Sequence, residues 1–380
     1  MEKKKIIRLA TVPLSLNVFC KDLLKELSAG YEVVAVSSPG KDLEEVAQRE
    51  GVRTIAVPIQ RRMSPLKDLG TLFSLIRIFR REKPSMVHSM TPKAGLLGMM
   101  AARIAGVRVR VHTFTGLVFP SSTGLSRRIL KTTDRLTCRF ATHVIPEGKG
   151  VMNDLLQNRI TKKPLKVLGY GNVRGVDMDY YSLSDDVVSE ARKLRNDSLF
   201  TLLFVGRVVA DKGINELIEA FCRLYEENSR MRLLLVGGFD DGLDPVSDKT
   251  KDIILNHKAV TLYDWQSDVR AFYAASDCFV LPSYREGFPN SVLEAGAFGK
   301  PSVVTDINGA NEIIAEEENG LIVPPKNAEA LYSAMKRISE DQELYGKMKS
   351  NARQMIASRF ERGYVWSCLK DFYREVLKDV

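Results

Sequence analysis

The sequence predicts an α/β protein built from two doubly wound domains, each with a parallel sheet. Short runs rich in Val, Ile and Leu alternate with helical stretches along the chain. A glycine-rich segment, GYGNVRGVD, interrupts this alternation, and a second series of strands follows it. Continuous apolar strands between helices are typical of a sheet covered on both faces. A length of 380 residues also exceeds what one core usually supports.

In the first series we expect seven strands with helices between them. The expected strands are Ile6–Leu9, Glu32–Ser37, Thr54–Val57, Met86–Ser89, Val109–Thr113, His143–Ile145 and Leu165–Leu168. The expected helices are Leu16–Ala29, Leu43–Glu50, Leu66–Arg81, Lys93–Ala105, Ser126–Phe140 and Gly150–Asn158.

The second series is expected to hold five strands and a helical tail. The strands are Thr201–Val205, Arg232–Val236, Val260–Tyr263, Cys278–Leu281 and Ser302–Thr305, and Ala328–Lys378 reads as helix almost throughout. We therefore expect an N-terminal domain at 1–172, a C-terminal domain at 173–358, and a last helix at 359–380 that packs back toward the N-terminal domain.

Composition points to a cytoplasmic globular protein. The apolar share is 44% and the charged share 27%. Five scattered cysteines argue against a disulfide framework or a zinc site. No stretch reaches the roughly 20 apolar residues of a membrane span. The basic N-terminus lacks the uninterrupted apolar region and cleavage site of a signal peptide.

The charge is unevenly distributed. Residues 1–170 carry 30 Lys and Arg against 13 Asp and Glu, whereas residues 171–380 carry 26 against 34. A basic half favours an anionic partner such as a lipid headgroup surface. The segment that most favours contact with an anionic lipid surface is Leu66–Arg81. It is amphipathic, with Leu66, Leu69, Phe73 and Ile76 on one side. Basic residues flank it: Arg61, Arg62, Arg77, Arg80, Arg81 and Lys83. A core-packed helix with solvated arginines explains the pattern equally well.

Two segments carry residues suited to a nucleotide diphosphate. Strand Thr201–Val205 runs into Gly206-Arg207, with Lys212 shortly before a helix. Arg offers a planar fork and Lys a point charge for phosphate oxygens.

Glu286 and Glu294 form the second segment, in PSYREGFPNSVLEAGAFGKPSVV. Glu286 is expected in the loop after strand Cys278–Leu281, and Glu294 one turn into the next helix. Carboxylates accept hydrogen bonds from sugar hydroxyls. Ser291 and Glu294 also match a capping box, in which Glu294 would serve only its own helix. The spacing does not decide between the two.

These motifs resemble family 4 of the glycosyltransferases, which have the GT-B fold. The resemblance rests on Gly206-Arg207 with Lys212-Gly213, on the two glutamates eight residues apart, on Asn308-Gly309 with Glu312, and on Asn319-Gly320-Leu-Ile-Val-Pro. It extends to HSMTPKAGLLGMMAARIAGV in the first half. Relatives with such a segment act mainly in bacterial capsule and O-antigen assembly.

The resemblance implies a role for each matching residue. Arg207 and Lys212 would hold the donor diphosphate, Glu286 the hydroxyls of the transferred sugar, and Glu294 the ribose. The implied donor-contacting residues are Gly206, Arg207, Lys212, Glu286, Gly287, Phe288, Pro289, Asn290, Ser291 and Glu294. Family members retain the anomeric configuration and need no metal or cofactor.

The chain departs from the family pattern in its first half. Many relatives carry a histidine before the glycine that corresponds to Gly116, where this chain has Thr115. Either Thr115 contacts the donor sugar instead, or His112 does so from a shifted backbone; we favour Thr115. The first loop also lacks the usual glycines and contains Ser15.

On the acceptor side, His88, Thr91 and Lys93 are expected at the end of the fourth strand. They would contact the acceptor or its phosphates, or Pro92 would simply begin a helix there. Asp177-Met-Asp179 resembles a metal-binding motif of another glycosyltransferase fold, but it coincides with this family's Gly-Val-Asp turn. We therefore expect no metal.

Together the motifs predict a hexosyltransferase or N-acetylhexosaminyltransferase at the inner face of the cell membrane. The expected donor is a UDP-sugar, and the expected acceptor is a lipid-linked oligosaccharide. A sugar-nucleotide 2-epimerase of the same fold is the alternative enzyme, although the second half holds few histidines. A basic nucleic-acid-binding protein is the alternative of another class; the basic residues are not interleaved with aromatic ones as such a surface requires, so no nucleic acid is expected.

Overall fold

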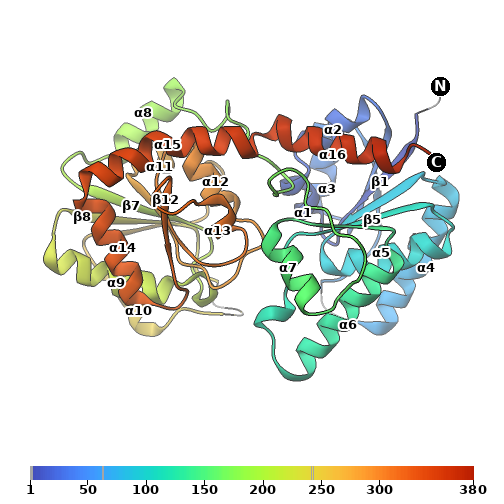
Figure 1. Ribbon diagram of the computed structural model, residues 1–380, viewed down its shortest axis with the longest axis horizontal. Coiled ribbons are helices and arrows are strands. Elements are labelled where there is room, and N and C mark those ends of the chain that lie inside the picture. The colour runs from blue at the N-terminus through green and yellow to red at the C-terminus, as the bar shows by residue number, and fades with distance from the viewer. Residues whose placement is uncertain (1–2, 62–63, 241, 243) are drawn as a thin grey trace. The chain divides into compact units, whose positions relative to one another are not determined.

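The computed structural model describes residues 3–61, 64–240, 242 and 244–380 (Figure 1). The chain divides into two compact units. The first contains the residues up to Gly175 together with Gly363–Val380, and the second is Val176–Arg362. Arg62, one of the basic residues expected to flank a helix, lies outside the described residues.

The first unit contains six strands and most of the last long helix. Its strands are β1 (Lys5–Leu9), β2 (Glu32–Ser37), β3 (Arg53–Ala56), β4 (Met86–Met90), β5 (Val109–Phe114) and β6 (His143–Pro146). Its helices are α1 (Pro13–Phe19), α2 (Leu23–Ser28), α3 (Lys41–Glu50), α4 (Pro65–Glu82), α5 (Pro92–Ile104), η1 (Phe119–Ser121), α6 (Gly124–Phe140), α7 (Lys149–Gln157) and α16 (Arg362–Val376).

The second unit repeats the pattern. Its strands are β7 (Phe200–Val205), β8 (Met231–Val236), β9 (Val260–Tyr263), β10 (Cys278–Leu281), β11 (Ser302–Thr305) and β12 (Gly320–Val323). Its helices are α8 (Asp185–Leu194), η2 (Ala210–Lys212), α9 (Ile214–Glu227), α10 (Asp248–Asn256), α11 (Arg270–Ala275), α12 (Asn290–Ala297), α13 (Ala310–Ile313), α14 (Ala328–Glu340) and α15 (Gln342–Phe360).

Both sheets have the same doubly wound topology. The strand order is β3-β2-β1-β4-β5-β6 in the first unit and β12-β11-β10-β7-β8-β9 in the second, and every pairing is parallel. The order reverses between β1 and β4, and between β7 and β10. Ligands of open parallel sheets bind outside the carboxyl ends of the strands at such a switch point.

The first sheet is covered on both faces. Helices α4, α5, α6 and α7 pack on one face around Leu75, Leu97 and Leu155. Helices α1, α2, α3 and α16 cover the other, where Leu24 and Phe372 are buried. Burial on both faces explains why the strands are apolar throughout rather than alternating.

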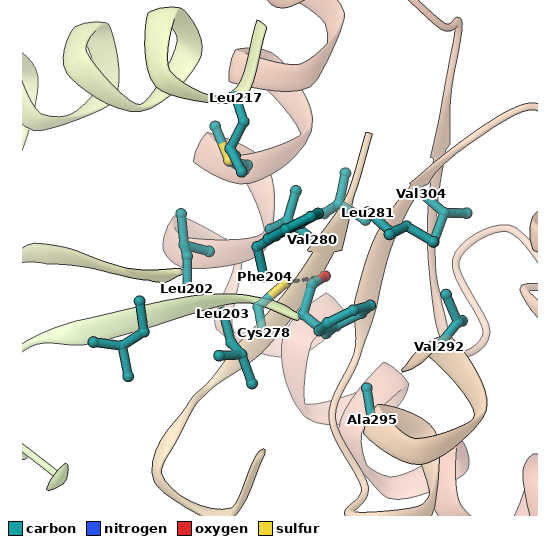
Figure 2. Packing of buried hydrophobic residues seen from close by; sticks show 14 of the residues in the cluster. Leu202, Leu203, Phe204, Leu217, Cys278, Val280, Leu281, Val292, Ala295 and Val304 are labelled. Carbon is teal, nitrogen blue, oxygen red and sulfur yellow. Dashed lines mark hydrogen bonds between the residues drawn. The ribbon is translucent and has the colours of Figure 1, made fainter. Parts of the chain in front are cut away.

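The second unit has one continuous core. Figure 2 shows side chains of β7 and β10, among them Phe204 and Val280, packed with Leu217 of α9 and Ala295 of α12. Because right-handed crossovers leave the switch point in opposite directions, α9 and α12 lie on opposite faces of this sheet.

Polar residues set the boundaries of the tail helices. Asp341 ends α14 and begins α15, and its carboxylate accepts the Leu344 N–H at 3.0 Å. Asn327 caps α14 in the same way through the Ala330 N–H at 2.9 Å. Such caps satisfy N–H groups that have no partner within the helix.

Three sequence-based assignments are wrong. Leu165–Leu168 is not a strand, because Pro164 lacks an N–H and Gly169 turns the chain at a φ of 55°. Leu16–Ala29 is two helices, broken at Asp22, whose φ is 63°. Strand β12 was not expected; it is short, begins with a glycine and lies at the sheet edge.

The orientation of α4 also differs from the expectation. Ile76 is buried with Leu75 and Phe79, whereas Leu66 and Phe73 are exposed. The 3.6-residue period groups residues 66, 69 and 73 on one side, but this side is not the one that packs on the sheet. The expectation that Ile76 shares one side with Leu66, Leu69 and Phe73 is therefore wrong, although the helix does pack on the core through its other side.

A buried polar cluster joins α16 to the first sheet. Arg8 of β1 donates to Tyr373 Oη at 2.7 Å and lies 2.7 Å from His88 Nδ1. His88 Nε2 lies 2.7 Å from Thr113 Oγ1. His112 is also buried and lies 2.8 Å from Ser89 Oγ.

Burial shifts the titration of both histidines in the same direction. It lowers the pKa of His112 to about 3 and, together with nearby Arg8, holds the pKa of His88 well below its usual range. Both rings are therefore neutral in the folded protein at pH 5.5, whereas the unfolded chain takes up protons below about pH 6.5.

Stability should therefore fall as the pH drops below about 6.5. Each buried histidine should contribute a loss of about 1.4 kcal/mol per pH unit in this window. Urea unfolding at pH 7.0 and 5.5 measures the net loss, to which Asp134, whose pKa burial raises to about 7, makes a contribution of opposite sign. His112→Asn, which cannot titrate, should reduce this net loss by about 1 kcal/mol. Equal losses in the wild type and the variant would contradict the assignment.

Candidate functional site

The switch point of the second sheet brings together the expected donor-side residues. Residues 206–213 follow β7, and residues 282–289 follow β10. These two strands are neighbours in the sheet, although Lys212 and Glu286, in the loops that follow them, are 74 positions apart in the sequence. A third loop, around Gly309, follows β11 beside them.

The backbones of these loops are in direct contact. A Cβ added at Gly213 would lie 2.0 Å from the carbonyl oxygen of Pro282, and one at Gly309 would lie 2.4 Å from that of Gly287. Both glycines also have positive φ angles, 70° and 77°. Only glycine fits either position, so these two residues determine how closely the three loops approach.

Lys212 and Glu286 meet at this junction. Lys212 Nζ forms an ion pair with Glu286 Oε1, which also accepts the Ser283 hydroxyl at 2.9 Å. Both side chains are largely buried, yet each keeps some exposure to solvent. The contact places a cation and a carboxylate side by side, one from each side of the switch point.

Arg207 is more exposed and has its own partner. It follows β7 directly and donates to Asp240 Oδ2 at 2.8 Å, from the loop after β8. This hydrogen bond lowers the pKa of Asp240. The guanidinium keeps further donors for other anions, because it carries five N–H groups.

The predicted capping box at Ser291 and Glu294 is wrong. Helix α12 begins at Asn290, after Pro289 at the N-cap, and no side chain caps it. Glu294 is therefore the fifth helical residue instead of the third and cannot reach back to the N-cap N–H.

Two tyrosines hold the Glu294 carboxylate instead. Tyr181 Oη donates to Oε1 at 2.8 Å, and Tyr273 Oη donates to Oε2 at 3.2 Å. Only 8% of Glu294 is exposed. An ionised carboxylate can accept several hydrogen bonds at once. The two tyrosines were not predicted, since neither is close to Glu294 in the sequence.

The segment between the two glutamates surrounds the start of α12. Gly287 contacts the Gly309 loop, and Phe288 is buried against Phe360, with ring centroids 5.4 Å apart. Pro289, Asn290 and Ser291 form the N-cap and the first turn. Free N–H groups and the helix dipole make a helix start favourable for anions.

In the first unit, a pair of threonines links the ends of β1 and β4 across the switch point. Thr91 Oγ1 accepts the Thr11 N–H at 3.0 Å and lies 2.8 Å from Thr11 Oγ1. Pro92 occupies the first turn of α5, as one of the two interpretations expected. Lys93 is paired with Asp68 of α4 at 2.7 Å.

His88 is not at the end of its strand, contrary to the expectation. It lies in the middle of β4, is buried, and contacts Arg8, Thr113 and Tyr373. Strand β4 is one residue longer than expected. The side chain of His88 belongs to the buried polar cluster described above. A direct acceptor contact from His88 is therefore not supported.

His112 is likewise a core residue of β5. Its ring packs on α5 so closely that a Cβ at Gly95 would lie 2.4 Å from Cε1. This placement favours Thr115 over His112 as the polar side chain at this end of the sheet. Thr115 and Gly116 lie in the loop after β5, where both are partly exposed.

Two further segments have local roles. Ser15 lies in the first turn of α1, so the expected open loop after β1 is a helix instead. Asp177 accepts the N–H groups of Asp179 and Tyr180 at 3.1 and 3.0 Å and pairs with Arg362 at 2.7 Å. These contacts make Asp177 a turn and ion-pair residue.

Solved structures with the same fold bind nucleotides. HepE from Anabaena in complex with UDP matches 98% of this chain and 100% of its own, with a TM-score of 0.82 and 20% identity. The two units thus form a two-domain α/β protein of the GT-B fold class, which confirms the predicted fold.

Sequence comparisons identify the family. Residues 16–171 match the glycosyl transferase 4-like domain, and residues 188–355 match glycosyl transferases group 1. The capsular polysaccharide biosynthesis glycosyltransferase CapM of Staphylococcus aureus is 29% identical over 100% of this chain and 99% of its own. The UDP-Gal:alpha-D-GlcNAc-diphosphoundecaprenol alpha-1,3-galactosyltransferase of Escherichia coli is 30% identical over 86% of this chain and 85% of its own.

The chain belongs to the family 4 glycosyltransferases. The prediction of a glycosyltransferase is confirmed, and the epimerase alternative is set aside.

Gly213→Ala should distort the junction of the loops. The Cβ meets backbone, which cannot rotate away, and the φ is unfavourable, so we expect a loss of about 2 kcal/mol or more in the free energy of unfolding. Gly346→Ala, in α15 with open space around the site, is the control and should be neutral or stabilising. Chemical denaturation measures both, and a Gly213→Ala variant as stable as the control would contradict the close approach.

Tyr181→Phe and Tyr273→Phe should weaken the positioning of Glu294. Each removes one donor to the carboxylate while the aromatic ring stays, so KM for the nucleotide donor should rise several-fold while kcat changes less. Tyr345→Phe, whose hydroxyl contacts Asp277 instead, is the control. Unchanged KM values in both variants would show that the tyrosines do not position Glu294.

Proposed function

We propose that the protein transfers a sugar from a UDP-sugar to a sugar carried on a polyprenyl diphosphate, in surface polysaccharide assembly. The observation that carries the proposal is the Lys212–Glu286 pair at the switch point of the second sheet. The name of the Escherichia coli relative, which gives a UDP-sugar donor and a lipid diphosphate acceptor, supports it. In this proposal the reaction takes place at the inner face of the cell membrane.

The two cations take the donor diphosphate. Lys212 supplies a compact charge beside Glu286, and Arg207 supplies a planar fork. The start of α12 adds N–H groups and its dipole. Together they stabilise the charge that develops on the departing nucleotide diphosphate, so that no metal or other cofactor is needed in this proposal.

Glu286 accepts hydroxyls of the transferred sugar. In the structure, Lys212 and Ser283 both contact the Glu286 carboxylate. When the diphosphate binds, Lys212 turns part of its donors toward phosphate, and Glu286 is free to accept from the sugar. Glu294, held by its two tyrosines, takes the ribose hydroxyls.

The transfer retains the anomeric configuration. The acceptor hydroxyl attacks the anomeric carbon from the face that the diphosphate leaves, as the bond between that carbon and the phosphate oxygen breaks. A phosphate oxygen of the leaving group takes the proton of the hydroxyl. No covalent protein intermediate forms, and the described residues act by holding and neutralising charge.

The acceptor side is assigned to the carboxyl end of the first sheet. Ser15, Thr91, Lys93, Thr115 and Gly116 lie after β1, β4 and β5 at this edge. Thr115 takes the place of the family's usual histidine with a hydroxyl. His88 and His112 support these loops from within the sheet and make no substrate contact in this proposal.

Glu286→Gln should lower kcat/KM at least 100-fold, because an amide keeps the shape but loses the charged acceptor. Glu340→Gln, on the exposed side of α14, is the control.

Thermal shift with UDP-, GDP- and ADP-sugars identifies the donor, which should add about 2 to 4 kcal/mol of apparent stability at high excess.

Full transfer by the Glu286→Gln variant would overturn the proposed role of this residue. Stabilisation by GDP- or ADP-sugars alone would overturn the assignment of a UDP-sugar as donor.

A further inference from the structure

Helix α4 exposes a stripe of large apolar side chains. Leu66 is 86% exposed, Leu69 50% and Phe73 63%. They lie in the first half of the helix, on the side away from buried Leu75 and Phe79. Such a stripe is unusual for a helix whose opposite face already packs on its sheet.

Helix α6 adds a second apolar group. Leu125 is 71% exposed, Ile129 is exposed in the next turn, and Val118 is exposed in the loop that leads into the helix. We call these six residues the apolar rim: Leu66, Leu69, Phe73, Val118, Leu125 and Ile129.

The rim follows one edge of the first unit. Helices α4, α5 and α6 are neighbours on one face of the sheet (Figure 1). Each starts after a parallel strand has ended, so their first turns lie toward the carboxyl edge of the sheet. The rim residues of α4 and α6 lie in the first half of each helix. They therefore share the edge that carries Thr91 and Thr115.

The charges on these two helices are of one sign. Exposed basic residues lie along both: Lys67, Arg77, Arg80 and Arg81 on α4, and Arg128, Arg135 and Arg139 on α6. The acidic residues are not exposed. Asp68 is paired with Lys93, Glu82 is buried and paired with Arg53, and Asp134 is buried.

We propose that the apolar rim of α4 and α6 inserts into the headgroup region of an anionic lipid bilayer while the surrounding arginines and lysines bind lipid phosphates. Apolar side chains gain by leaving water at the boundary between headgroups and acyl chains, and each nearby cation adds to the attraction. Lys67 and Arg128 lie among the rim residues, and Arg77 follows Phe73 by one turn of α4, so the charges nearest the rim match an anionic surface.

This membrane contact rests on the proposed function, because its purpose is to bring the protein to a lipid-linked acceptor. A diphosphate carried on a lipid lies at the level of the headgroups. A first unit that rests on its carboxyl edge presents the acceptor-side loops to that level. Among the described residues, none of the helices has the length and hydropathy of a transmembrane span.

The test uses the whole protein and vesicles made of equal parts phosphatidylglycerol and phosphatidylcholine, with pure phosphatidylcholine vesicles beside them. The rim variant is Leu66→Ser/Leu69→Ser/Phe73→Ser. The control variant is Leu183→Ser/Leu255→Ser/Trp265→Ser, which removes three similarly exposed apolar side chains from the second unit. All six sites are exposed, so circular dichroism and thermal unfolding should show intact folds.

We expect the wild type and the control to bind anionic vesicles, and the rim variant to bind at least tenfold more weakly. Arg77→Gln/Arg80→Gln should weaken binding several-fold and reduce its salt dependence. The inference is overturned if the rim variant binds like the wild type, or if neutral vesicles bind the wild type as tightly as anionic ones.

A second copy of the chain is the competing occupant. Sedimentation of the wild type and the rim variant without lipid distinguishes it: a dimer lost in the rim variant, with vesicle binding unchanged, would overturn the membrane assignment. Transfer to a water-soluble, short-chain acceptor should be equal in the wild type and the rim variant. Because vesicle binding is measured without sugar transfer, a failed activity assay and a failed membrane contact are separate results.

Discussion

Backbone contact between the loops at the switch point of the second sheet is the constraint on which the candidate active site depends. Gly213 and Gly309 leave room for carbonyl groups where any side chain would collide. The loops can therefore approach closely enough for Lys212 to reach Glu286. Lys212 and Glu286 are already held side by side, so little rearrangement is needed when Lys212 contacts a phosphate and Glu286 contacts a sugar hydroxyl.

The sequence predicts most of the fold because both sheets are buried on both faces. A run such as Cys278–Leu281 has no polar residue to interrupt it, and the strand bounds match the structure there. The failures have local causes. The edge strand Gly320–Val323 begins with a glycine, a residue that is rare in strands, and the period of α4 does not reveal which of its sides is buried.

The site is less predictable because its geometry comes from residues far apart in the chain. The loop position of Glu286 follows from the strand before it. Local spacing left Glu294 open between a cap and a ligand contact, because the sequence does not reveal that the N-cap is Pro289. The hydroxyl of Tyr181 reaches Glu294 only in the folded unit. His112 was also ambiguous in the sequence, and the close packing of Gly95 on its ring identifies it as a core residue.

The anchoring of α16 on the first sheet has a consequence for biosynthesis. Leu369, Phe372, Tyr373 and Leu377 complete a core whose other buried members come from the first 150 residues, and Tyr373 accepts a hydrogen bond from the buried Arg8. During translation, the residues of the second unit, which ends at Arg362, leave the ribosome before these residues do. The first unit therefore cannot complete its core until the last residues of the chain have been made, so it does not finish folding ahead of the second unit as the usual N-to-C order of domain folding would have it.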